Sequence, residues 1–232
     1  WPEVGYNVKA YPEIIFGKKP WSINSTTNEL PIKIDNVETF EVNFDLNIEA
    51  SGNYNLAFEF WVTEDSISNQ DQITNEVMIW TANSLLQPAG EQISVFFSDG
   101  YYYDLYRAEF DDWIYYAFVS QTDQQEGTLN VHNFINYMLA TGHLNPNEYM
   151  ASFELGNEIV NGSGQTNIEL YSISVNETLS IPKDLNEQNT FKYYAAVPNP
   201  FNPETTIKYY LYEKSLVRIT IFDLVGSVVD NL

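Results

Sequence analysis

Strict alternation of apolar and polar residues limits most strongly what this chain can fold into. From Phe40 to Ile48, every second residue is apolar and the residues between them are Glu, Asn or Asp. Because successive side chains of a β-strand point to opposite faces of a sheet, this pattern predicts a strand buried on one face. Similar runs occur at residues 56–63, 77–80, 93–97, 113–120 and 168–175, with turn-forming clusters such as Ser51-Gly52-Asn53 between them. Many short strands separated by turns predict an all-β sandwich or barrel.

One segment has a different period. Between residues 131 and 139 the apolar residues recur at spacings of three and four, and Gly142 stands where a helix would end. We predict a single helix there, with its apolar side packed against the outer face of a sheet.

Composition and charge limit the kinds of partner. The chain carries 32 acidic and 10 basic side chains, a net charge of −22, which argues against nucleic acid because phosphate binding needs Lys and Arg. A neutral polysaccharide fits this charge, although an acidic surface that merely keeps an exported protein soluble explains it equally well. The sequence has no Cys, only two His and no apolar run of membrane-spanning length, so thiolate sites, His-based metal clusters and membrane spans are not expected. Aromatic residues form 16% of the chain, and exposed rings commonly stack on sugars.

A domain boundary is predicted near residue 181. The stretch through residue 189 is polar, and the charge balance changes: residues 1–191 hold 28 acids and 6 bases, whereas residues 192–232 hold 4 of each. We expect a first domain at residues 1–181 and a linker at residues 182–194. The remaining residues, 195–232, are too few to make a stable domain alone.

Candidate catalytic groups stand beside aromatic residues on the predicted strands. Glu76, Met78 and Trp80 share one strand face, opposite Val77 and Ile79, which suit a core. A carboxylate among apolar groups on a concave face is costly unless it has a function. An edge-strand Glu that points into water explains the pattern equally well.

Two further segments repeat this combination. Glu59 and Trp61 share a strand face, and so do Glu154, Gly156 and Glu158, where Gly156 is expected to leave room for a ligand. Carboxylates with rings on one sheet face suit glycoside hydrolysis, in which one acid protonates the leaving oxygen and a second attacks or activates water. A non-catalytic carbohydrate-binding module shows the same features, so both functions stay open from these residues.

The same segments resemble bacterial members of glycoside hydrolase family 12. The matching motifs, in the family's order across roughly residues 1–178, are residues 11–21 (YPEIIFGKKPW), 55–63 (NLAFEFWVT), 76–80 (EVMIW) and 153–164 (FELGNEIVNGSG). The resemblance implies a jelly-roll sandwich of two curved antiparallel sheets, with substrate lying across the concave one. It also implies hydrolysis of β-1,4-glucan or xyloglucan with retention of configuration, without a metal or organic cofactor.

The resemblance assigns roles to individual residues. Glu76 falls on the nucleophile and Glu158 on the acid/base, whose pKa the neighbouring Glu76 charge is expected to raise. Glu59 falls on a position, often Asp, whose carboxyl group hydrogen-bonds the nucleophile and should keep it ionised. The further candidates for substrate binding are Met78, Trp80, Trp61, Pro88, Trp21 and Trp113. Of these, Trp21 and Trp113 fit the core equally well.

Both ends of the chain depart from the family pattern. Family members begin with further strands before residues 11–12, so we expect an N-terminally incomplete domain with uncovered sheet edges. Residues 197–207 (VPNPFNPETTI) and 217–223 (VRITIFD) resemble a C-terminal immunoglobulin-like sorting domain of exported proteins from Bacteroidetes-like bacteria, cut short here. That tail implies export through secretion machinery or attachment at the cell surface.

The sequence therefore predicts a monomeric, secreted bacterial endo-β-1,4-glucanase acting on β-glucan polysaccharide. The alternatives are a non-catalytic carbohydrate-binding jelly-roll, an inactive fragment, and a xylanase of a related family with the same fold. Met78 and Trp80 after the nucleophile fit the glucanase better than the xylanase.

Overall fold

The computed structural model describes residues 8–176 and, beyond them, Thr206 and four short strands. The chain divides into two compact units, residues 1–177 and 178–232. In the second unit, strands pair antiparallel two by two: β11 (Phe191–Tyr193) with β12 (Tyr209–Leu211), and β13 (Thr220–Phe222) with β14 (Val228–Asn231). The predicted linker, residues 182–194, and sorting domain, residues 195–232, lie mostly outside the described residues and stay predictions.

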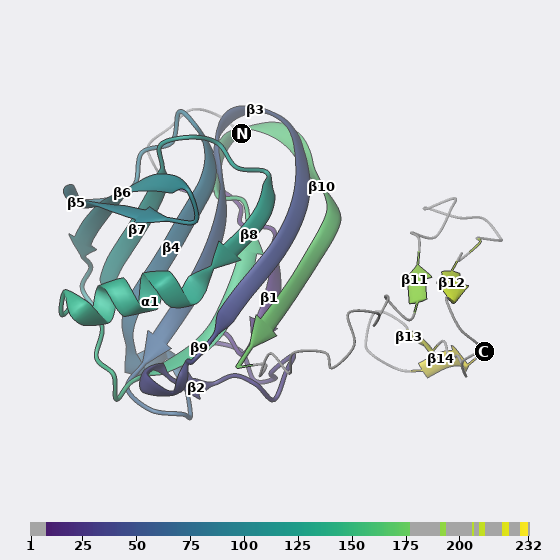
Figure 1. Ribbon diagram of the computed structural model, residues 1–232, viewed down its shortest axis with the longest axis horizontal. Helices are drawn as coiled ribbons and strands as arrows, with labels where there is room; N and C mark the ends of the chain where they lie inside the picture. Colours follow the sequence, from purple (N-terminus) through teal and green to yellow (C-terminus); the bar gives the residue numbers. More distant parts are fainter. Residues whose placement is uncertain are drawn as a thin grey trace. The chain divides into compact units, whose positions relative to one another are not determined.

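Ten strands of the first unit form one hydrogen-bonded sheet that folds into two curved layers (Figure 1). One layer has the strand order β1-β9-β3-β4-β7-β6-β5, and β10 and β8 pair with β3 in the other. The strands are β1 (Glu13–Gly17), β2 (Ile32–Lys33), β3 (Phe40–Thr63), β4 (Ile73–Ser84), β5 (Glu91–Ser98), β6 (Tyr101–Glu109), β7 (Ile114–Ser120), β8 (Glu126–Asn130), β9 (Tyr149–Gly156) and β10 (Ile159–Val175). Two short 3-10 helices, η1 (Ile34–Asn36) and η2 (Gln70–Gln72), lie in the connections.

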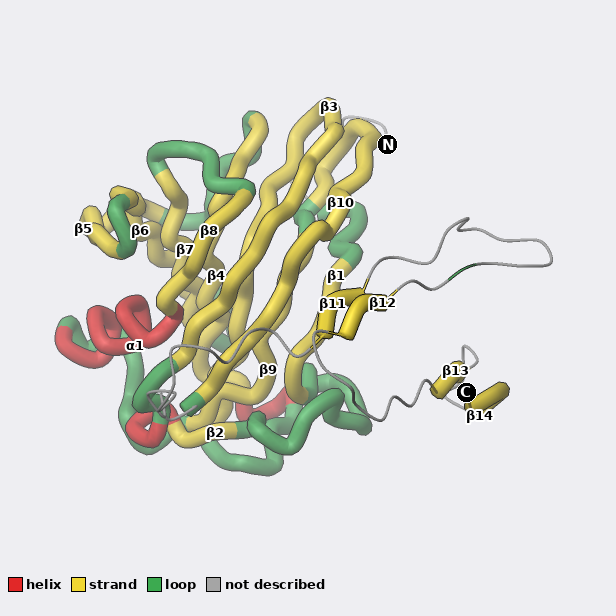
Figure 2. The backbone as a smooth tube through the Cα atoms, turned by 45° about the vertical axis from the view of Figure 1, so that its right-hand side comes forward, coloured by secondary structure: helices red, strands yellow, loops and turns green. Residues whose placement is uncertain are grey.

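The long strand β3 belongs to both layers. Its first half pairs with β8 and β10, and its second half pairs with β4 and β9. Strands β9 and β10 follow one another along the same side of β3, with Gly156 opposite Ala57 and Ile159 opposite Tyr54. The two therefore run with β3 as one ribbon that bends from layer to layer (Figure 2). Among the described strands every pairing is antiparallel except that of β4 with β7.

The core lies between the layers, as the alternation predicted. In the first half of β3, Phe40, Val42 and Phe44 are buried, whereas Glu41 and Asp45 are exposed. These apolar residues form one cluster with alternate side chains from the second half of β3, from β4 and from β7, namely Phe58, Phe60, Val77, Ile79 and Phe118. Burying each such side chain contributes about 1.5–3 kcal/mol, so the alternation is the main reason that the two layers stay together.

The predicted helix is present as α1 (Val131–Ala140) and packs on the β5–β7 part of the sheet, on the face that also carries the core. Its Phe134 packs edge-on against Phe118 of β7, with ring centroids 5.0 Å apart. Gly142, at φ +73°, follows the last turn, and its N–H donates to the Leu139 carbonyl while the N–H of His143 donates to that of Met138. This Schellman arrangement explains why the helix ends where the sequence indicates.

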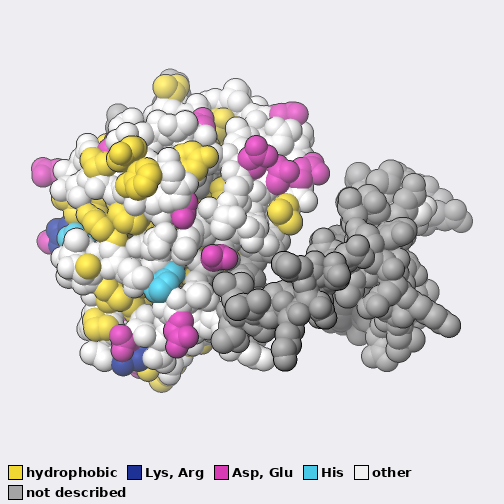
Figure 3. Space-filling model, in the orientation of Figure 1, with side chains coloured by type: hydrophobic (Ala, Val, Ile, Leu, Met, Phe, Trp, Pro, Cys, Tyr) yellow, Lys and Arg dark blue, Asp and Glu magenta, His cyan; other side chains and the backbone are white. Residues whose placement is uncertain are grey.

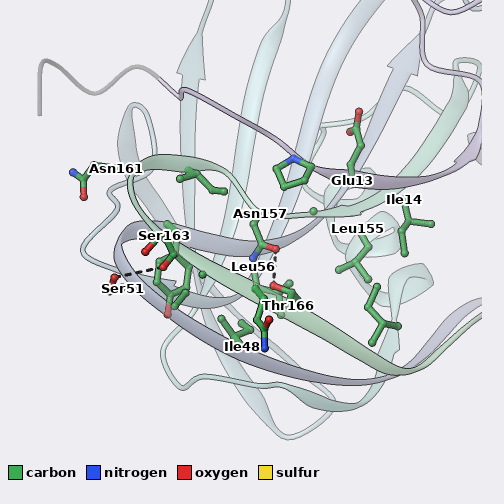
Figure 4. Close-up of a pocket in the computed structure, with 18 residues that line it drawn as sticks. Glu13, Ile14, Ile48, Ser51, Leu56, Leu155, Asn157, Asn161, Ser163 and Thr166 are labelled. Carbon is green, nitrogen blue, oxygen red and sulfur yellow. Dashed lines mark hydrogen bonds between the residues drawn. The ribbon is translucent and has the colours of Figure 1, made fainter. Parts of the chain in front are cut away.

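A groove of about 470 Å³ opens between β1 and β10, each of which pairs with a single strand in the described sheet (Figure 4). Its apolar lining includes Ile14, Ile48 and Leu155. A hydrogen bond from Thr166 to Asn157, 2.8 Å long, lies beside it. The predicted N-terminal incompleteness of the domain is not decided by these edges and stays a prediction.

The surface carries many more acidic than basic side chains. Figure 3 shows Asp and Glu spread over one face of the first unit, with few Lys or Arg, and hydrophobic side chains gathered on the side where β5 and β6 lie in Figure 1. No helix in the described part of the chain is long and apolar enough to cross a membrane.

Candidate active site

Strands β3 and β4 place the candidate residues on the face turned away from the core. Trp61 lies directly opposite Glu76, and Glu59 lies opposite Met78. Met78 and Trp80 belong to an apolar cluster separate from the core that takes up the intervening residues of β4. Strand alternation thus correctly predicted which side of β4 faces the core.

Glu76 is held by an indole. The Nε1–H of Trp113 donates a 2.7 Å hydrogen bond to Oε2 of Glu76. Burial raises the pKa of Glu76 to about 7, the Trp113 hydrogen bond opposes this rise, and the charge of Glu158 adds to it. Glu76 therefore stands close enough to Glu158 for the charge of one to affect the proton of the other.

Three tryptophans form a row beside Glu76. Trp113 packs edge-on against Trp61 at 5.5 Å between ring centroids, and Trp61 packs edge-on against Trp21 at 5.0 Å. Trp61 is buried, Trp113 is half-buried, and Trp21 is 49% exposed. An exposed ring at one end of this row offers a flat apolar surface to a ligand, while the buried members hold it in place.

Glu158 lies in the two-residue link between β9 and β10, where the ribbon with β3 is interrupted. The interruption is closed by Asn55, whose Nδ2 donates to the Glu158 carboxylate at 2.5 Å and whose Oδ1 accepts from the Glu158 N–H at 2.8 Å. Burial raises the pKa of Glu158 to about 6, and the hydrogen bond from Asn55 opposes that rise. The sequence placed Glu158 on a regular strand face; the structure shows that a break in the strand directs it instead.

Glu59 is buried and stands directly opposite Glu154 on β9. Burial and the Glu76 charge raise the pKa of Glu59 well above its usual value. Burial and the Glu59 charge likewise raise the pKa of Glu154 to about 9. Two facing carboxyl groups in a dry site cannot both ionise easily, so this pair retains protons near neutral pH.

Lys19 is the cation beside this pair. Its Nζ lies 2.8 Å from Oε2 of Glu154 and 2.5 Å from Oε2 of Glu13. Ser152 also donates to Oε1 of Glu154 at 2.9 Å. The face therefore carries five carboxyl groups, those of Glu13, Glu59, Glu76, Glu154 and Glu158, and one ammonium group in their midst.

Tyr11 fills the space beside Gly156, so the expectation that Gly156 leaves room for a ligand was wrong. A Cβ at Gly156 would lie 2.6 Å from Cε2 of Tyr11 and 2.8 Å from the Pro12 carbonyl oxygen. Burial and the Glu59 charge raise the pKa of Tyr11 well above its usual value. Gly156 therefore allows the phenol to pack against the acid cluster.

Two expectations about the acids need correction. No hydrogen bond between Glu59 and Glu76 is found in the described residues; the donor to Glu76 is Trp113. The pKa of Glu158 is raised by burial, whereas the predicted effect of a neighbouring charge falls on Glu76. The first error comes from the register, which sets Trp61, and not Glu59, opposite Glu76.

The remaining candidates differ in how much surface they offer. Met78 and Trp80 are each only 1% exposed, and Nε1 of Trp80 points at the Met78 sulfur at 3.4 Å, so both support the floor of the site from below. Pro88 is half-buried in the connection between β4 and β5.

The model of glycosyl hydrolase family 12 matches residues 5–176 of this chain. The chain belongs to glycosyl hydrolase family 12. It is therefore a glycoside hydrolase, and the predicted fold, a jelly-roll sandwich of two curved layers with one helix, is confirmed by its likeness to solved family 12 structures. One of these, a family 12 xyloglucanase from Bacillus licheniformis, matches with a TM-score of 0.71 and 27% identity over 75% of this chain and 78% of its own. An endoglucanase from Rhodothermus marinus matches with a TM-score of 0.69 and 25% identity over 74% and 76%.

Two curated family 12 relatives are similar in sequence. Endoglucanase S of Pectobacterium parmentieri is 29% identical over 183 residues, which are 75% of this chain and 69% of that protein. Xyloglucan-specific endo-beta-1,4-glucanase A of Emericella nidulans is 26% identical over 126 residues, which are 52% of each chain.

The sequence analysis missed several residues of this family 12 site. Nothing in the motif GKKP separates Lys19, which reaches the buried acids, from Lys18, which reaches the carbonyl oxygens of Ile67 and Ser68. Asn55 opens the motif of residues 55–63, from which only Glu59 and Trp61 were taken as candidates. Tyr115, buried on β7, has its pKa raised first by burial and then by the charges of Glu158, Glu76 and Glu59, and parity on its strand could have indicated it.

Proposed function

We propose that this family 12 hydrolase cleaves β-1,4-glucan with retention of configuration, using Glu76 as nucleophile and Glu158 as acid/base. The observation that carries the proposal is the presence of two half-buried acids, Glu76 on β4 and Glu158 at the β9–β10 link. Each carboxyl group is fixed by one donor, Trp113 or Asn55, and the charge of Glu158 affects the proton of Glu76.

The proposed reaction has two steps. Glu76 attacks the anomeric carbon and forms a glycosyl ester while Glu158 gives its proton to the departing glycosidic oxygen. Glu158 then takes a proton from water, the resulting hydroxide attacks the anomeric carbon, and the bond to Glu76 breaks. Both acids recover their starting protonation, and the product keeps the starting configuration.

The pair can share the single proton that this scheme needs. With pKa values of about 7 and about 6, Glu76 and Glu158 together hold a single proton in this pH range, since the first charge disfavours the second. The higher value belongs to Glu76, so in the free protein this proton lies mainly on Glu76. The reactive form carries it on Glu158, and the hydrogen bond from Trp113 favours that form by stabilising ionised Glu76.

The rings and the relatives support the glucan substrate. Trp21 exposes its ring at the end of a packed row that leads to Glu76, as a sugar-stacking residue requires. The relatives bear the names of endoglucanases and of xyloglucan-specific glucanases, so both unbranched and branched β-1,4-glucans are proposed substrates. Trp61, Trp113, Met78, Trp80 and Pro88 are proposed to shape or support the sugar-binding surface.

The test is sugar release from carboxymethylcellulose, mixed-linkage glucan and xyloglucan by the full chain and by Glu76→Gln. Glu41→Gln, which changes an exposed Glu on the outer side of β3, is the matched control. We expect Glu76→Gln to abolish turnover and the control to keep it. Binding of polysaccharide without turnover by any folded form would favour the carbohydrate-binding alternative instead.

The stereochemistry has its own test. Proton NMR of the first products should show the β-anomer, which mutarotates later. The α-anomer as first product would establish inversion and remove Glu76 from the role of nucleophile.

The cellular setting is a separate proposal. We propose that the protein is exported from a bacterial cell through the C-terminal region and works as a monomer outside the cell or at its surface. Fractionation of the producing cells and the elution volume of the purified chain in size-exclusion chromatography test the two parts.

A further inference from the structure

Lys19 occupies an unusual place for a lysine. The residue is 6% exposed, lies just after β1, and has its ammonium group between the carboxylates of Glu13 and Glu154. Its Nζ also lies 4.9 Å from the ring centroid of Trp21 and 5.4 Å from that of Tyr11. A buried cation with two carboxyl and two aromatic partners is fixed in position.

The groups that face Lys19 come from every neighbouring element. They are Glu13 of β1, Glu154 of β9, Glu59 of β3, Glu76 of β4, and the rings of Tyr11 and Trp21. In residues 8–176 the remaining ion pair joins Arg107 to Glu109 at the surface. Among the ion pairs of residues 8–176, those of Lys19 are therefore the ones that bring a positive charge to this acid cluster.

We propose that Lys19 is a positioning residue for the reaction: its ammonium group orients Glu13 and Glu154 and, through space, keeps Glu76 ionised. The inference rests on the proposed function, in which Glu76 must be a carboxylate to attack the sugar. Lys19 opposes the rise that burial causes in the pKa of Glu59, Glu76 and Glu154. Without this cation the cluster has to take up another proton to limit its charge.

The sign of the effect follows from the role of Glu76. Loss of the cation raises the pKa of Glu76, so the fraction of ionised nucleophile falls at low pH. The acidic limb of the pH–rate profile then moves to higher pH. No ion pair joins Lys19 to Glu76 in the described residues. We therefore expect the acidic limb to shift by about half a pH unit, less than the 1–3 units that a direct ion pair causes.

The experiment compares pH profiles of kcat/KM on soluble glucan for the full chain and four variants. Lys19→Met removes the charge, Lys19→Arg keeps it, and Glu154→Gln breaks the same contact from its other side. Lys18→Met is the matched control, because Lys18 binds loop carbonyl oxygens instead of the acid cluster. We expect Lys19→Met to move the acidic limb upward, Lys19→Arg and Lys18→Met to leave it in place, and Glu154→Gln to leave it in place or move it downward.

A purely structural role makes a different prediction. If the contact served only to hold β1 to β9, Lys19→Met and Glu154→Gln would disturb the site alike and move the limb in the same direction. That result, or an unmoved limb in Lys19→Met, overturns the proposal.

A readout without turnover separates this inference from the proposed function. Carbon-13 NMR titration of labelled Glu side chains, with the Glu76 signal assigned through Glu76→Gln, follows the pKa in free protein. A rise of the Glu76 pKa in Lys19→Met supports the electrostatic role even if no glucan is cleaved, and an unchanged pKa rejects it even if turnover is found.

Discussion

The side-chain amide of Asn55 binds both ends of Glu158, donating to its carboxylate at 2.5 Å and accepting from its backbone N–H at 2.8 Å. Asn55 also accepts at its backbone carbonyl from the Asn157 side chain at 2.7 Å. One fully buried residue thus determines both where the strand breaks and where the proposed acid/base points.

Replacing Asn55 should therefore affect activity more than a typical buried polar substitution does. Asn55→Ala leaves the Glu158 carboxylate and N–H without their partner, which should destabilise the fold by about 1–3 kcal/mol. Because the Asn55 hydrogen bond lowers the pKa of Glu158, its loss raises that pKa and moves the basic limb of the pH–rate profile upward. Urea unfolding and pH profiles measure both effects. Asn53→Ala, two residues away on β3, is the control, and equal profiles for the two variants would contradict the role given to Asn55.

Trp113→Phe removes the donor to Glu76 and keeps most of the ring. The hydrogen bond lowers the pKa of Glu76, so its loss should raise that pKa above about 7 and shift the acidic limb upward. A hydrogen bond to a charged group contributes about 1.5–3 kcal/mol, which corresponds to roughly a 10- to 100-fold loss of kcat/KM below the limb. Tyr102→Phe, which removes a hydroxyl from an exposed ring on β6, should behave like the parent chain. A Trp113→Phe profile that overlays the parent's would exclude the indole from this function.

Glu158→Gln should lower kcat by about 10²- to 10⁴-fold on polymeric glucan, the usual contribution of a general acid. The loss should be much smaller on an aryl glucoside with a good leaving group, because such a group departs without protonation. Single-turnover kinetics with both substrates test the difference. Equal losses on the two substrates would argue against Glu158 as the acid.

Stability should fall as pH rises through the neutral range. Glu76, Glu158 and Glu154 have folded-state pKa values of about 7, 6 and 9, all above the ordinary 4.5, so the folded state binds more protons than the unfolded one between these limits. Their stabilising effect is complete below pH 4.5 and is lost stepwise up to about pH 9. Urea midpoints at pH 5, 7 and 9 should decrease in that order. Glu154→Gln should flatten the curve at its upper end, and a midpoint that rises with pH would contradict the assigned directions.

Gly156→Ala should displace Tyr11. The added methyl group would stand 2.6 Å from the phenol ring, and overpacking of this kind costs about 1–3 kcal/mol. A double-mutant cycle with Tyr11→Ala tests the cause, since the Gly156→Ala cost should fall once the ring is gone and keep only the part due to the Pro12 carbonyl oxygen at 2.8 Å. Additive costs would mean that the backbone, and not the ring, opposes the methyl group.

The sequence was sufficient to predict those parts of the fold that depend on local periodicity. Alternation from Phe40 to Ile48 gave the buried face of β3, and the spacing before Gly142 gave α1 and its end. The face of Glu76 followed from its two core neighbours, Val77 and Ile79. Each of these depends on residues that are close in sequence, which is why a pattern can show them.

Features set by strand register could not be predicted in this way. Which residue lies opposite Glu76 depends on the register between β3 and β4. The sequence led us to expect Glu59 as the partner of Glu76, whereas Trp61 lies opposite Glu76 and Trp113 donates the hydrogen bond. The break at Glu158 exists because an Asn side chain replaces a backbone carbonyl, a choice invisible in the alternation. Lys19 and Glu154 meet across two strands that lie more than a hundred residues apart in the sequence.

The ribbon that β3 forms with β9 and β10 has a mechanical consequence. Because β3 runs through both layers and β9 continues into β10 beside it, neither layer can detach without breaking hydrogen bonds in the other, and the protein should lose its structure in one cooperative step. Amide hydrogens of the first half of β3 and of its second half should then exchange with solvent at matching rates. Formation of so many contacts between distant segments should also make folding slow. The proposed polysaccharide-binding site would thus lie on a sheet that does not separate locally from the second layer.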